Sequence, residues 1–187
     1  MIKKISIFTL PFLFFLNCAT HGIYKKNQAD TFDETNSAEI RVSNFIISKI
    51  NGQPTESVLQ KTGTNIFISK PSYDKHFKVP PGDYEFDLFY FHHQNRRHAG
   101  TITSTTTTSD TMKLKFTAKK NQVISICYLM LSETEAVTKV KAEARIYNFP
   151  EDFKSEIFIP FSSNIDHLPG GCYGYSGQGS TIIGTSN

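Results

Sequence analysis

Apolar and polar residues alternate along several short stretches of the chain, which is the pattern of half-buried β-strands. The clearest example is residues 79–91, VPPGDYEFDLFYF, where a Pro-Pro-Gly turn leads into a strict period of two. One side of this strand carries apolar and aromatic residues, namely Tyr84, Phe86, Leu88 and Tyr90. The other side carries Glu85 and Asp87, so we expect a strand with one face on the core and one face in water.

Similar signals predict strands along much of the remaining chain, at 38–50, 64–70, 75–79, 112–116, 123–131, 138–149 and 156–161. The first is long and we expect a bulge near residues 43–44, before the turn sequence NGQP at 51–54. Residues 123–131 are apolar on both faces, which is typical of a central strand. Two segments leave helix open: residues 55–61 fit a short helical turn or a loop, and Ala, Glu and Lys favour helix between 133 and 145, although the period of two favours a strand.

Short strands separated by turns, with no strand–helix–strand alternation, predict an all-β fold, specifically an antiparallel β-sandwich over residues 38–162. Residues 18–37 are polar without periodicity and predict a flexible tether. Residues 92–100, HHQNRRHAG, predict a polar loop, and the Thr-rich run at 103–110 fits an exposed strand or loop. The Gly-rich residues 163–187 predict a poorly ordered tail.

The first 17 residues differ from this pattern and predict a cleaved signal peptide. Lys3 and Lys4 form a positive region, and the apolar run that follows, residues 5–16, is too short for a transmembrane helix. The run ends in FFLNCAT, where Phe15, Leu16 and Asn17 precede Cys18 without the small residues of an ordinary cleavage site.

This ending resembles a bacterial lipoprotein signal, in which the cysteine is acylated and the chain is cut just before it. Phe15 and Asn17 depart from the strict lipobox and are similar to the relaxed form of spirochaetal lipoproteins. The resemblance implies lipidation of Cys18, with fatty acyl chains such as palmitate holding the protein on a membrane. Plain secretion and an uncleaved anchor are the alternatives. Because residues 19–22 carry no acidic side chain, the resemblance favours the outer membrane.

Net charge argues against a nucleic-acid partner. The formal charge is +3, but Lys3 and Lys4 belong to the signal segment, so the mature chain is nearly neutral. The only local basic cluster, Arg96, Arg97 and His98, is too short to displace counterions from many phosphates. An oxidising compartment permits a disulfide between Cys127 and Cys172, which the sequence alone does not decide.

Candidate chemistry is sparse. His92, His93 and His98 could form a zinc or copper site, but neighbouring strand residues diverge, and a polar surface hairpin loop is the favoured explanation. Asp83, Glu85 and Asp87 could suggest calcium, but they fit a solvated strand face. No nucleophile elbow, zinc-protease motif or phosphate-binding loop is present, so we expect no enzyme activity and no cofactor.

A second resemblance supports the same class of protein. IISKINGQP, followed by VPPGDYEFDLFY, is similar to the hairpins of small bacterial lipoprotein and surface β-sandwich domains, over roughly residues 40–130. The resemblance implies a lipid-anchored, non-enzymatic module of the cell envelope that meets envelope or host proteins. The alternative is a periplasmic metal or small-ligand binder that uses the 92–98 histidines.

Overall fold

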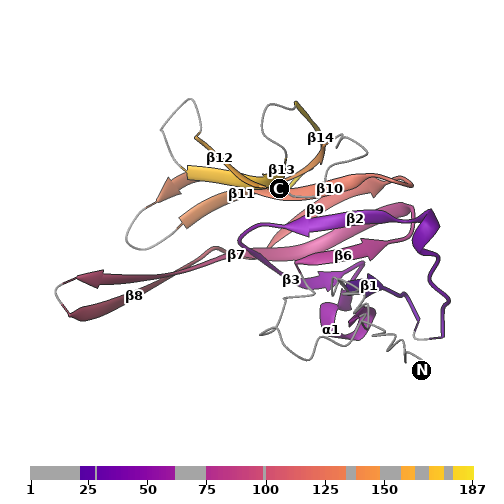
Figure 1. Cartoon of the computed structure of the whole chain (residues 1–187), viewed down its shortest axis with the longest axis horizontal. Coiled ribbons are helices and arrows are strands. Elements are labelled where there is room, and N and C mark those ends of the chain that lie inside the picture. The colour runs from indigo at the N-terminus through magenta and orange to yellow at the C-terminus, as the bar shows by residue number, and fades with distance from the viewer. Residues whose placement is uncertain are drawn as a thin grey trace, which may run out of the picture.

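The computed structural model describes residues 22–27, 29–61, 75–98, 100–133, 138–147, 157–162, 169–174 and 179–187. Within them the protein is an all-β sandwich of two mainly antiparallel sheets (Figure 1). The larger sheet contains β1 (Gly22–Tyr24), β2 (Ala38–Val42), β5 (Leu59–Lys61), β6 (His76–Val79), β10 (Val123–Glu133), β11 (Thr138–Tyr147), β12 (Ile157–Ser162), β13 (Pro169–Gly174) and β14 (Ser180–Thr185). The smaller sheet contains β3 (Phe45–Ile50), β4 (Gln53–Pro54), β7 (Gly82–His98), β8 (Thr101–Thr108) and β9 (Met112–Ala118).

Two short helices accompany the sheets, the 3-10 turn η1 (Glu34–Asn36) and the single turn α1 (Thr55–Val58). The side chain of Asp33 caps η1 by accepting a hydrogen bond from the backbone N–H of Thr35 at 2.9 Å. α1 follows Pro54 and is the short helical turn left open by the sequence. The strand interpretation of residues 138–149 is confirmed by β11, so the helical alternative there is wrong.

The core lies between the two sheets and is rich in aromatic side chains. Three ring pairs join a strand of the larger sheet to β7, namely Tyr24–Tyr84 at 5.6 Å, Phe77–Phe86 at 6.1 Å and Tyr128–Tyr90 at 5.2 Å between centroids. The predicted alternation is confirmed, because Tyr84, Phe86, Leu88 and Tyr90 are all buried. Each such fully buried side chain contributes about 2–3 kcal/mol of transfer free energy.

The expected long strand at 38–50 is instead two strands in different sheets. β2 pairs with β6 and β10 in the larger sheet, whereas β3 pairs with β7 in the smaller one. The chain crosses between the sheets at Ser43 and Asn44, where Asn44 has φ of 53°. The break in alternation at residues 43–44 therefore marks a change of sheet and not the expected bulge. A bulge and a change of sheet both interrupt the alternation.

The sandwich extends further toward both ends of the chain than residues 38–162. β1 lies within the expected tether and pairs with β5 and β6. β13 and β14 lie within the expected tail and pair with β10, β12 and β11. The expectation of flexibility is wrong for these strands, because backbone pairing does not require an apolar alternation and Gly-rich segments fit where strands approach closely. The predicted strand at 64–70 lies outside the described residues.

Candidate functional site: the projecting hairpin

The most distinctive feature of the surface is a two-stranded arm formed by residues 91–98 of β7 and residues 101–108 of β8. Figure 1 shows it projecting from one end of the sandwich. The two strands pair in continuous antiparallel register from Phe91–Thr108 to His98–Thr101. Most of the described side chains of the arm are exposed. The expected polar loop at 92–100 is therefore wrong, because residues 92–98 continue β7.

A polar face of the arm carries two of the three candidate histidines. His92, Gln94 and His98 share this face with Thr103, Thr105 and Thr107 of β8. His93 belongs to the opposite face, where its Nδ1 lies 2.9 Å from Oγ1 of Thr106. Along a strand, six residues span about 20 Å, so His92 and His98 are also far apart. The structure therefore does not bring His92, His93 and His98 together.

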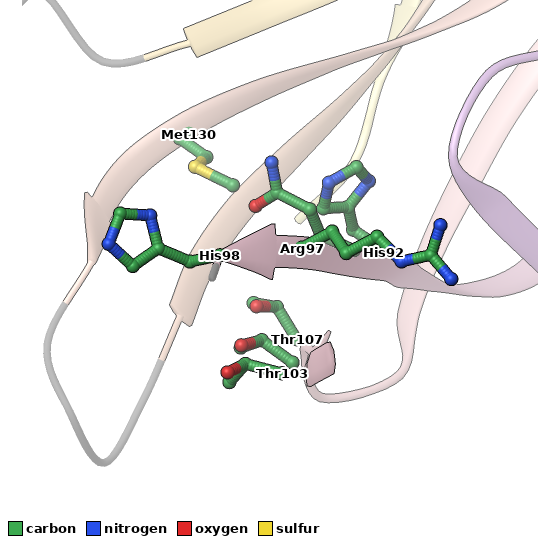
Figure 2. A pocket seen from close by; sticks show the side chains of 8 residues that line it. His92, Arg97, His98, Thr103, Thr107 and Met130 are labelled. Atoms are coloured by element: carbon green, nitrogen blue, oxygen red, sulfur yellow. The ribbon is translucent and has the colours of Figure 1, made fainter. Parts of the chain in front are cut away.

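The polar face borders a groove of about 770 Å³ that reaches the body of the sandwich (Figure 2). Arg97 lines it from the arm, and Met130 of β10 lines it from the larger sheet. At the base of the arm the ring of His92 stacks on Tyr90, with centroids 6.4 Å apart, and Tyr90 is buried against Tyr128. The end of the groove at His92 therefore lies next to the buried core.

The charge of the arm is one-sided. Between Asp87 and Asp110 the sequence holds no acidic residue, while it holds Arg96, Arg97 and three histidines. Hydroxyl groups of threonine and the Gln94 amide supply hydrogen-bond donors and acceptors. This set of groups can bind polar or anionic chemistry.

The acidic face of β7 is neutralised by the neighbouring strand. Lys113 Nζ lies 2.6 Å from Glu85 Oε1 and 3.2 Å from Asp87 Oδ1, and Lys115 Nζ lies 2.8 Å from Glu85 Oε2. These contacts lower the pKa of Glu85 to about 2, first through the hydrogen bond from Lys113. The arrangement is a cross-strand ion-pair ladder, as expected for a solvated strand face, and the carboxylates do not curve around one centre.

One buried carboxylate was not identified from the sequence. Glu143 is only 4 % exposed and accepts hydrogen bonds from Arg145, from Nε at 3.0 Å and from Nη2 at 2.6 Å. Arg145 Nη1 also donates to Ser180 Oγ at 3.3 Å, so the pair ties β11 to β14. The close contact between this carboxylate and the guanidinium therefore has a structural role in joining the two strands. Within the described part of the chain, no three His, Cys, Asp or Glu residues gather as a metal site.

The remaining candidate residues are the three cysteines. Cys127 and Cys172 form a disulfide, with Cα atoms 4.5 Å apart, between β10 and β13. Together with Tyr147 they make a small buried cluster separate from the main core. Cys18 lies outside the described residues.

Comparisons with protein-family models, curated proteins and solved structures gave no significant match to this chain. Among the described residues, no helix has the length and apolar character needed to cross a membrane.

Proposed function

We propose that this protein is a lipid-anchored, non-enzymatic lipoprotein of the cell envelope that works through its surface. The observation that carries the proposal is the N-terminal sequence, in which a short positive region and an apolar run end at Cys18. A multiply acylated Cys18 would hold the sandwich at a bilayer, preferably the outer membrane, without a transmembrane helix.

The arm supports an interaction role. An isolated two-stranded hairpin is marginally stable in water, so a projecting arm of sixteen mostly exposed residues is costly to keep ordered unless something binds it. Its hydroxyl, amide and basic groups suit contacts with the polar surface of an envelope or host protein. The arm is therefore the part of the surface that we assign to partner contacts.

The anchor is tested by the intact mass of the mature protein extracted from membranes. We expect a chain that starts at Cys18 and carries acyl groups, and we expect Cys18→Ser to abolish both the cleavage and the added mass. Thr20→Ser, two residues further on, is the matched control and should be processed like the wild type. An unacylated mass in the soluble fraction would contradict the proposal.

The groove supports a second candidate, a periplasmic binder of a metal or small ligand. His92 and His98 both line its wall, which favours a polar ligand in the groove over one metal ion held by all three histidines. Calorimetry of the full chain with zinc and with copper separates the two cases. Saturable heat below micromolar concentration, lost in His92→Ala, would favour the metal; its absence would remove the metal version of this candidate.

A further inference from the structure

The backbone contacts at the base of the arm show which residues of β8 present free backbone groups. Ser109 N–H donates to Tyr90 O of β7 at 3.2 Å. Phe91, the residue after Tyr90 on β7, directs its N–H away from β8 and donates to Asn44 O at 2.9 Å. Hydrogen bonds in an antiparallel ladder alternate in direction from one residue to the next. With the observed register, Thr107, Thr105 and Thr103 therefore bond to β7. The outer edge of β8 is formed by Ile102, Ser104, Thr106 and Thr108.

Among the described residues, this edge carries no charge, proline or neighbouring strand that would protect it. In the described part of the chain, β8 pairs with β7 and with no other strand. Its sequence, TITSTTTT, holds no charge and no proline, and six of its eight residues are threonine. Ile102 on this edge is 59 % exposed. An uncharged, β-branched edge strand is a template for pairing with another strand.

We propose that β8 pairs antiparallel with β8 of a second copy of this chain, so that two arms form one four-stranded sheet. A two-fold axis at Thr105 places Ser104 opposite Thr106 of the other copy and Ile102 opposite Thr108. These are the residues whose backbone groups point outward, so the pairing satisfies both edges at once. Hydroxyl side chains then lie opposite hydroxyl side chains, and β-branched side chains opposite β-branched ones, which is favourable in antiparallel pairs.

Charge selects β8 over the other edge of the arm. Arg96 and Arg97 lie on β7. Pairing two β7 strands would bring the two basic strands to about 5 Å from each other, the spacing of neighbouring strands. Pairing through β8 keeps the two β7 strands three spacings, about 14 Å, apart, which exceeds the Debye length of about 8 Å at physiological ionic strength. An uncharged edge thus meets an uncharged edge, and the basic strands stay outside.

The inference rests on the proposed function, because it names the partner of the arm, but it does not depend on lipidation. Dimerisation and acylation are measured separately, so the failure of one leaves the other standing.

The experiment is sedimentation equilibrium of the mature full chain in a density-matched detergent, over a range of protein concentrations. Wild type should be dimeric, and Ser104→Pro should raise the dissociation constant at least tenfold, since proline removes an outward N–H. Ser104→Ala keeps that N–H and Asn95→Pro removes an outward N–H from the β7 edge, so both should stay dimeric. Far-UV circular dichroism checks that each variant folds.

Hydrogen exchange supplies a second readout. The amides of Ser104 and Thr106 should gain protection as protein concentration rises, while those of Asn95 and Arg97 should not. The proposal is overturned by a chain that stays monomeric throughout, as expected if β8 receives a strand of a different protein. It is equally overturned if Ser104→Pro dimerises like Ser104→Ala, or if Asn95→Pro dissociates the dimer instead.

Discussion

Cys127 and Cys172 face each other at the point where β10 exchanges one neighbouring strand for another. Along this edge of β10, the parallel pairing with β2 ends at Ile126, which lies opposite Val42. The antiparallel pairing with β13 begins at Tyr128, which lies opposite Gly171. The disulfide therefore joins β13 to β10 at Cys127, the first residue of β10 beyond its pairing with β2.

Replacing both cysteines with alanine should lower the free energy of unfolding by up to about 4 kcal/mol, because the bridge closes a long loop in the unfolded chain. The two residues are 45 positions apart. Urea unfolding of the wild type, with and without reductant, and of the double variant measures the effect. The reduced wild type and the double variant should agree. A double variant as stable as the oxidised wild type would show that the bridge adds nothing.

The last strand should be sensitive to a single methyl group. A Cβ at Gly184 would collide with the backbone carbonyl oxygen of Lys115, whereas a Cβ at Gly179 meets nothing within 4 Å. Gly184→Ala should therefore displace β14 and destabilise the protein by about 1–3 kcal/mol. Gly179→Ala is the matched control and should unfold at nearly the wild-type temperature.

Hydrogen exchange locates the displacement. Ser186 N–H donates to Ala142 O at 2.9 Å and Ser186 Oγ accepts from Ala142 N–H at 2.9 Å, so these amides should exchange faster in Gly184→Ala. Unchanged exchange at both amides would mean that the carbonyl of Lys115 moves without disturbing β14.

The crossing between the sheets depends on Asn44. Its φ of 53° is unfavourable for most residues, and its carbonyl accepts the Phe91 N–H at the base of the arm. Asn44→Ala should cost about 1–2 kcal/mol, since alanine lacks the tolerance of asparagine for left-handed backbone. Asn44→Gly keeps that freedom and loses the same side chain, which hydrogen-bonds to Tyr128. Equal destabilisation by both variants in thermal unfolding would assign the whole effect to that hydrogen bond.

Strands with one buried face and one exposed face could be predicted because apolar and polar residues alternate along them with a period of two. Residues 84–90 have that period and form a strand with buried alternate residues. Residues 140–146 also form a strand, but there Ala142, Glu143 and Ala144 are all buried while Val140 and Ile146 are only partly buried. The arm could not be recognised in this way, since both of its faces are wet and His92 to His98 show no apolar alternation. β13 was missed for a related reason: Gly170 and Gly171 carry no side chain that could show a pattern.

The candidate site was predictable only in part. The divergence of His92 and His93 follows from strand geometry and needs no structure. The contact between the arm and the larger sheet, through Met130 and the Tyr90–Tyr128 pair, joins residues some 40 positions apart. Such pairings depend on sheet topology, which local pattern does not contain.

A partly buried carboxylate should make stability depend on acidity. Glu39 Oε1 lies 2.7 Å from His76 Nε2 and 2.8 Å from Arg41 Nε. Burial raises the pKa of Glu39, but the hydrogen bond from His76 and the charge of Arg41 outweigh it and lower the pKa to about 2. Because the folded pKa lies below the unfolded value near 4.5, the carboxylate stabilises the fold above pH 4.5 and loses this effect as pH falls toward 2.

Glu39→Gln should therefore cost roughly 3 kcal/mol near neutral pH and progressively less below pH 4.5, by urea unfolding at a series of pH values. Glu85→Gln is the control, since Glu85 has a similarly lowered pKa but lies in an exposed ladder with Lys113 and Lys115. Salt screens exposed pairs more strongly than buried ones, so 0.5 M salt should weaken the pH dependence due to Glu85 and largely spare that due to Glu39. If 0.5 M salt weakened the pH dependence due to Glu39 as much as that due to Glu85, the Glu39 cluster would be as open to solvent as the ladder.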